Sequence, residues 1–325
     1  MVGLFAFFGA FLLYPIWLTV QGGFEGRDGG FTLHHILTVF NDPVLFDGFL
    51  NAIGIAVGTT LVCLIIALPL ATLAARYTFP FKGVFSALVL VPLILPPFVG
   101  AIGLHHLLGK YGAINTLLVD MGLFSEGYDF IGNGGFWAIV FIEALHLYPI
   151  LYLNATAALA NLDPALEEAA ENMGATPWQR FRQIVMPLIR PGLFAGATIV
   201  FIWSFTELGT PLMFDYQVVT PVQIFNGIKE MNTSQEPYAL TAVMLFAAIM
   251  FYLLGKMVFG GKAYAMYSKA SVQSSPEKLS PLRGWFAMAA FTIVIGLAVL
   301  PHISVLFTSL AVEGSWYKTV LSATW

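Results

Sequence analysis

The sequence predicts an all-α protein, a polytopic bundle of transmembrane helices. Hydrophobic residues make up 58% of the chain and charged residues only 10%, whereas a soluble domain has about 25% charged residues. The apolar residues also gather in runs long enough to cross a bilayer, which takes about 20 residues in an α-helix. Composition and run length together place the chain in the membrane class.

Seven such runs follow one another along the chain. They cover residues 2–20, 49–75, 84–109, 135–160, 191–213, 238–259 and 285–310. The first run has no basic flank before it and ends in Tyr14-Pro15-Ile16-Trp17, which differs from the small-residue end of a cleaved signal peptide. We therefore expect it to be a retained helix.

The third run is interrupted by Pro92, Pro96, Pro97, Gly100 and Gly103. Such breaks are tolerated where neighbouring helices satisfy the freed backbone groups. This pattern predicts that the third span packs inside the bundle.

A polar loop at 161–190 separates the fourth and fifth runs. Asp163-Pro164 is typical of a helix start, because Asp caps a helix and Pro suits its first turn. Gly174 is expected to end this helix in a left-handed conformation. Thr176-Pro177 predicts a second short helix that runs to Pro187. The loop should therefore be a compact helical knob.

The basic residues favour one orientation in the membrane. With strict alternation, the segments on the side of the 161–190 loop, with the adjoining end of the sixth run, hold ten Lys and Arg residues, and those on the other side hold four. Because cytoplasmic loops carry the excess of Lys and Arg, the loop and the N-terminus are expected to be cytoplasmic.

The polar loop resembles the loop by which permease subunits of bacterial ABC importers engage their ATPase. That family has Glu-Ala-Ala, three residues, Gly, nine residues and Ile-x-Leu-Pro, and this chain departs from the pattern only at Met186. The resemblance implies a bacterial inner-membrane permease with a coupling loop made of Glu168, Ala169, Ala170, Gly174, Trp178, Phe181, Arg182, Ile184 and Pro187. Glu168 would pair with a basic residue of the ATPase, while Trp178, Phe181 and Arg182 would act as interface anchors.

The resemblance also implies the partners. They are an ABC ATPase at the cytoplasmic face, a solute-binding protein outside, a second permease half (fused or dimeric) and membrane lipid, with no nucleic acid. A phosphate-binding P-loop needs Gly-Lys followed by Ser or Thr, and the Gly-Lys pairs here are followed by Tyr, Met and Ala. ATP should therefore be bound by the partner, and we expect neither an enzyme nor a bound cofactor.

An internal repeat links the first and last spans. Phe5 and Pro15 recur as Phe291 and Pro301 with the same separation, although two apolar helices can match in this way by chance. The predicted organisation is a permease domain at 1–260, a cytoplasmic linker at 261–284, and the first span of a second half at 285–325, as in a fused permease cut short.

Three ionisable residues lie within the predicted spans, where such residues are functional candidates. Glu143 and His146 share one face of the fourth span, and Glu207 lies in the fifth. They either line a translocation path or make hydrogen bonds between helices. A single Glu-x2-His is too little for a carboxylate-bridged metal site, so no metal or catalytic site is predicted, and Cys63 is expected to be a packing residue.

The sequence does not determine the substrate. The outer segments hold eleven acidic residues against four basic ones, a field that would concentrate a cation. The fused layout and the passage Phe-Thr-Glu-Leu-Gly-Thr-Pro-Leu at 205–212 resemble ferric iron permeases; thiamine, polyamine and aminoethylphosphonate permeases are alternatives. A membrane enzyme or a channel, with the loop only structural, is the competing function.

Overall fold

The computed structural model describes residues 1–26, 29–128, 130–131, 135–228, 234–259 and 277–310. Within these ranges six helical segments are long and apolar enough to cross a membrane. A bent helix pair at 82–120 makes a seventh if it counts as one span. The six segments are Gly3–Gly23, Pro43–Arg76, Phe136–Ala160, Pro177–Phe205, Glu236–Phe259 and Pro281–Leu310. The all-α polytopic prediction is confirmed.

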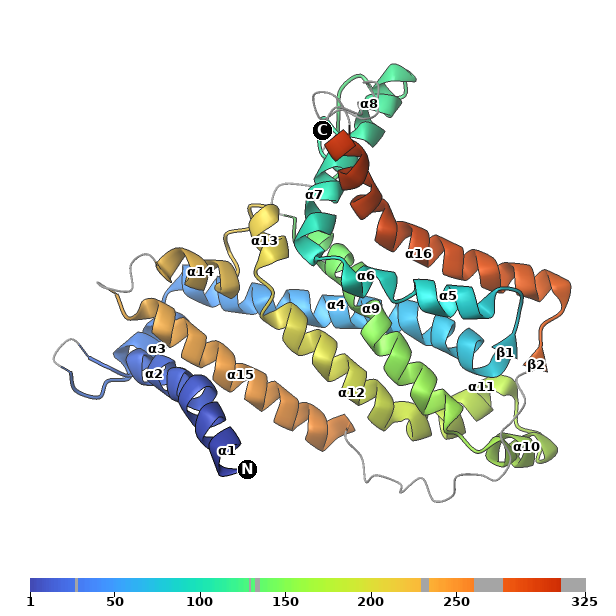
Figure 1. Cartoon of the computed structure of the whole chain (residues 1–325), viewed down its shortest axis with the longest axis horizontal. Helices are drawn as coiled ribbons and strands as arrows, with labels where there is room; N and C mark the ends of the chain where they lie inside the picture. The colour runs from blue at the N-terminus through green and yellow to red at the C-terminus, as the bar shows by residue number, and fades with distance from the viewer. Residues whose placement is uncertain (27–28, 129, 132–134, 229–233, 260–276, 311–325) are drawn as a thin grey trace.

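Three helices form the centre of the molecule (Figure 1). α4 (Pro43–Arg76) packs along α9 (Phe136–Ala160), and both pack against α12 (Met186–Phe205). Asp42 caps α4 by accepting hydrogen bonds from the backbone N–H groups of Val44 and Leu45. At 34 residues, α4 is about 51 Å long, so it extends beyond a hydrocarbon layer of about 30 Å.

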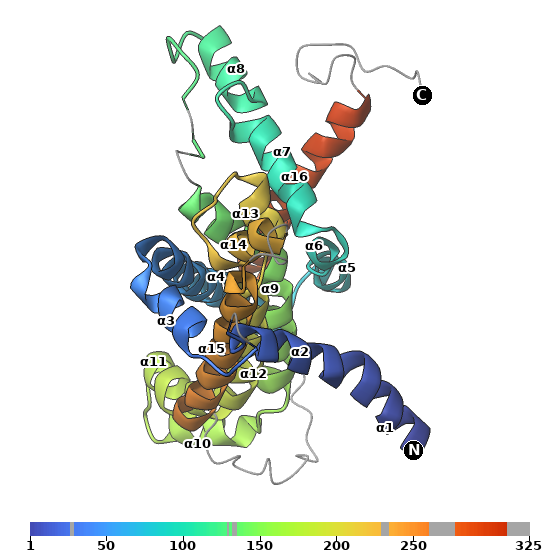
Figure 2. The same ribbon diagram turned by 90° about the vertical axis from the view of Figure 1, so that its left-hand side faces the viewer.

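The first span is a helix on the outside of the bundle. It consists of α1 (Val2–Phe8), a π-helical turn η1 (Gly9–Leu13) and α2 (Tyr14–Gly23). α2 packs against α15 (Glu236–Phe259), whereas Phe5 and Phe11 are more than two-thirds exposed. Figure 2 shows this segment projecting from the body. The segment is helical as predicted, and little of it is covered by the described residues.

The third predicted span is not one helix. It is divided into α5 (Lys82–Leu88), α6 (Val91–Ile94) and α7 (Pro97–Leu108), and the chain bends by 94° at Leu95-Pro96. The prediction of a single span inside the bundle is therefore wrong in part: α6 packs on α9, while α7 leads away along α16 to α8 (Ala113–Asp120). Pro96 and Pro97 cannot donate backbone hydrogen bonds, which explains the position of the break.

α16 (Pro281–Leu310) closes one side of the bundle by two close contacts. Phe291 is fully buried among the rings of Phe79, Phe85 and Tyr152. Further along, Gly103 of α7 lies so close to Pro301 that an added Cβ would come within 1.8 Å of its carbonyl oxygen. The seventh predicted span is thus an integral part of the packing.

Short elements complete the described chain. A two-residue parallel pair joins β1 (Tyr77–Thr78) to β2 (Glu277–Lys278). The remaining short helices are α3 (His34–Asn41), α10 (Pro164–Asn172), α11 (Pro177–Arg180), the π-helical turn η2 (Phe181–Val185), α13 (Gly209–Met213) and α14 (Thr220–Gly227). Most of the predicted linker at 261–284 lies outside the described residues.

Candidate functional site: the 163–187 loop and the buried polar cluster

The loop forms the two-helix hairpin that its capping residues predict. The Asp163 carboxylate accepts a hydrogen bond from the Ala165 N–H, and α10 follows directly. Gly174 has φ +84°, a conformation that costs other residues about 1–2 kcal/mol. Thr176 and Gln179 then form a reciprocal capping box at the start of α11. These local signals explain why the chain reverses at this point.

The second helix of the loop does not end at Pro187, which corrects the prediction. α11, η2 and α12 form one helical segment of 29 residues from Pro177 to Phe205. Pro187 occupies the first turn of α12, and the π-helical turn before it accommodates the missing backbone donor. A force on the hairpin would therefore pass directly into a membrane span.

Two ion pairs fix the hairpin. Both guanidinium nitrogens Nη1 and Nη2 of Arg76 donate to the Glu167 carboxylate, at 3.0 and 2.8 Å. This pair joins the end of α4 to α10, and the side chains are 30% and 22% exposed. Within the loop, Arg180 pairs with Glu171 at 2.5 Å. The hairpin is therefore bound to α4 and α12, two of the three central helices.

Most of the predicted coupling residues lie on the surface. Trp178 is 66% exposed, and its ring stacks on that of Phe181. Phe181 is half-buried and packs against the hydrophobic core between α4, α9, α12 and α16. A hollow of about 360 Å³ lies between the two arms and is lined by residues that include Ala170, Gly174 and Ile184. The exposed positions are Glu168, Ala169, Gly174, Trp178, Arg182 and Pro187, and the half-buried ones are Ala170, Phe181 and Ile184.

Glu143 and His146 are enclosed within the bundle. Glu143 is 1% exposed, and its Oε2 accepts hydrogen bonds from the hydroxyls of Ser204 and of Thr59, the latter at 3.4 Å. His146 is 6% exposed and lies edge-on to Trp203. Three helices, α4, α9 and α12, thus meet at one carboxyl group. This arrangement fits interhelical hydrogen bonding, the second of the two roles considered for these residues.

Glu207 does not lie within a span, contrary to the prediction. α12 ends at Phe205, and Glu207 occupies the turn before α13. Its Oε1 accepts hydrogen bonds from the backbone N–H groups of Gly209 and Thr210, at 3.0 and 3.4 Å. Gly209 and Pro211 favour a turn followed by a new helix, which explains the earlier end of the fifth span.

Sequence reasoning missed Arg76 and Glu167 as part of the site. They are 91 residues apart, and no local pattern connects them. One weak signal was available, because Arg76 ends an apolar run and Glu167 lies in the only acidic cluster of the predicted inner segments. Two such charges on the same face of a membrane are candidates for a pair.

The fold and the loop define a class of protein: a multi-pass helical membrane protein with a helical hairpin that carries the sequence Glu-Ala-Ala. Over residues 67–264 the chain matches the family described as binding-protein-dependent transport system inner membrane component. The chain belongs to this family, and it is an ABC importer permease subunit. The matched residues include the whole hairpin, α12 and the last turns of α4, which carry Arg76.

The names of the individual relatives indicate different transported solutes. The chain is 29% identical over 196 residues to the spermidine/putrescine permease PotB of Haemophilus influenzae, covering 58% of this chain and 68% of that protein. It is 28% identical over 255 residues to a putative ferric transport permease, FbpB 1, of the same organism, covering 76% of this chain and 38% of that protein. Thus it spans little more than a third of the ferric relative.

A solved structure shows the same fold. A chain of a bacterial ABC transporter involved in the import of the acidic polysaccharide alginate aligns with a TM-score of 0.58 at 18% identity. The alignment covers 79% of this chain and 92% of that chain. This protein therefore shares its helical arrangement with a chain of that transporter.

Proposed function

We propose that the 163–187 hairpin is the surface on which a separate ATPase subunit docks, and that ATP is bound by that subunit. The observation that carries this proposal is the attachment of an exposed hairpin to two central helices. α11 continues into α12, and Arg76 holds α10 to α4. Movement of a bound ATPase would thus turn both helices together and drive alternating access.

The docking surface suits this role in its chemistry. Glu168 and Ala169 lie on the exposed side of α10, and Trp178 and Arg182 project from the second arm. Small residues allow close approach, while Trp and Arg are enriched among the residues that dominate interface energies. The hollow between the arms, about 360 Å³, could accept a side chain of the partner.

The remaining partners and the substrate are also proposals. A solute-binding protein would deliver the substrate to the acidic outer face, and α16 would be the first span of a second permease half. The acidic outer segments and the ferric relative favour ferric iron as substrate. A relative named for spermidine and putrescine transport has a similar identity, so uptake of labelled ferric iron and of putrescine by the complete transporter is the deciding comparison.

Co-purification tests the docking surface. The chain would be purified with the ATPase encoded nearest to its gene, as wild type, as Gly174→Asp and as Gly122→Asp. Gly122 is a matched control, since it also has a positive φ (+70°) and open space around it, in a segment predicted to lie outside. We expect Gly174→Asp alone to lose the ATPase. Equal retention by both variants would show that the ATPase does not dock on this hairpin, and no association of the wild type would contradict the proposed partner.

A further inference from the structure

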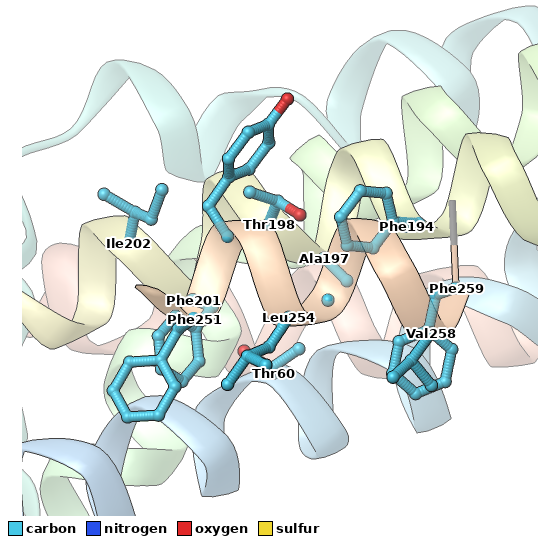
Figure 3. Close-up of a pocket in the computed structure, with 12 residues that line it drawn as sticks. Thr60, Phe194, Ala197, Thr198, Phe201, Ile202, Phe251, Leu254, Val258 and Phe259 are labelled. Carbon is cyan, nitrogen blue, oxygen red and sulfur yellow. The ribbon is translucent and has the colours of Figure 1, made fainter. Parts of the chain in front are cut away.

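An apolar groove runs along the bundle between α4, α12 and α15. The groove has two parts. The lower part is the one lined by Arg190, with a volume of about 620 Å³, and the upper part is the one lined by Ile202, with a volume of about 340 Å³. The two parts share Thr60, Phe194, Ala197 and Phe259 in their walls. Figure 3 shows the side chains of the upper part between the ribbons of the three helices.

The part of the groove between Arg190 and Ile202 matches one leaflet of a bilayer in length, and the groove continues past Arg190 to Met186 and Pro187. Arg190 and Ile202 are twelve residues apart on α12, which corresponds to about 18 Å along a helix. Half of the hydrocarbon layer is about 15 Å thick. A single acyl chain that enters at the Arg190 end would therefore fit along the groove.

The Arg190 end of the groove carries positive charge. The guanidinium of Arg190 lies 5.0 Å from the ring centroid of Phe259, and its Nη2 donates to the Val258 carbonyl. A guanidinium has five N–H donors, and the described residues take one of them. Lys256, also exposed, lies 6.0 Å from the ring centroid of Tyr252 but lines neither part of the groove. The groove thus combines an apolar channel with one guanidinium in its wall, which is the complement of a phospholipid with an anionic headgroup.

We propose that this groove binds a phospholipid with an anionic headgroup. One acyl chain lies between α4, α12 and α15, and the headgroup phosphate contacts Arg190. Anionic lipids are enriched in the cytoplasmic leaflet, and basic pockets between helices on that side bind their headgroups. The assignment to this leaflet rests on the proposed orientation, whereas lipid binding itself does not. A second permease half is the competing occupant of the groove.

Lipid retention in detergent tests the site. The full chain would be equilibrated with mixed micelles of phosphatidylglycerol and phosphatidylcholine, and the retained lipids would be measured by native mass spectrometry. We expect a preference for phosphatidylglycerol of about fivefold from one basic side chain. Arg190→Gln should reduce this preference to near unity. The matched control is Arg283→Gln, which removes the same charge at the start of α16, away from the groove, and should change nothing.

Two further variants separate the occupants. Ala197→Phe fills the shared part of the groove and should lower retention of both lipids, whereas Ala197→Cys in a Cys63→Ala background reports a covering protein. Equal retention of both lipids by the wild type, equal effects of Arg190→Gln and Arg283→Gln, or a disulfide between two copies at position 197 would overturn the proposal. The assay needs no ATPase, so loss of lipid binding and loss of ATPase docking are distinguishable.

Discussion

The Arg76–Glu167 pair provides the sharpest test of the mechanical coupling. Arg76→Met keeps the apolar stem but removes the guanidinium, and Glu167→Gln keeps the shape but removes the charge. A charged hydrogen bond contributes about 1.5–3 kcal/mol, while exposed ion pairs contribute about 0.2–1 kcal/mol. The side chains are 30% and 22% exposed, so we assign this bidentate pair about 1.4 kcal/mol, or about tenfold in the equilibrium that holds the hairpin on α4.

The assay is the number of ATP molecules hydrolysed per solute transported, measured in liposomes with the complete transporter. Each single variant should raise this ratio by up to about tenfold, because the ATPase would move a hairpin that no longer moves α4. The double variant should be no worse than either single variant, since the second substitution removes a contact that is already lost. Arg76→Glu with Glu167→Arg should recover part of the coupling. Arg283→Met is the matched control.

The reasoning would be refuted by additive effects of Arg76→Met and Glu167→Gln. Additivity would mean that each residue acts through other partners, for example Arg76 through the C-terminal end of α4, where a cation is favourable. Co-purification of the ATPase with each variant is needed in parallel, because loss of assembly would also reduce transport.

Three further predictions follow from single positions. Gly174→Val should weaken coupling more than Gly174→Asn, because Asn tolerates the left-handed conformation and a β-branched residue does not. Solute uptake is measured for variants that insert into the membrane normally, and equal uptake by the two variants would contradict the prediction. Glu143→Leu should lower the detergent melting temperature more than Glu143→Gln, which keeps an acceptor for two hydroxyls at about 0.6 kcal/mol each; a greater loss with Gln would show that charge is required. Gly103→Ala should destabilise the protein because its Cβ meets the Pro301 carbonyl, whereas Gly296→Ala, with open space around it, should be neutral in the same melt.

The sequence could predict the elements that depend on local chemistry. Hydropathy located the apolar part of every long helix. Asp163, Gly174 and Thr176 determined the hairpin, because a cap or a left-handed turn involves only neighbouring residues. The end of the fifth span was misplaced because the apolar composition continues to Met213 while the helix stops at Phe205. Hydropathy reports only how apolar a segment is, so it does not reveal a turn within an apolar segment.

Long-range features could not be predicted in this way. The prolines at 92–97 predicted a break in the third span, but the direction of the bend depends on the packing of α6 on α9 and of α7 on α16. The ion pair between Arg76 and Glu167 likewise depends on where α4 ends relative to α10. A single sequence specifies these contacts physically, although no periodicity or motif reveals them.

The buried carboxyl explains why α4, α9 and α12 would move as one body. Thr59 of α4 and Ser204 of α12 both donate to Glu143 of α9, and separation of any pair would leave polar groups without partners in hydrocarbon, which is costly. The hairpin is attached to the same body through Arg76 and through α11. A conformational change driven from the hairpin should therefore leave this body intact and be taken up at its borders. The Leu95-Pro96 bend between α6 and α7 is the border where the backbone is already interrupted, so α7 and α16 are the elements expected to shift against the central three.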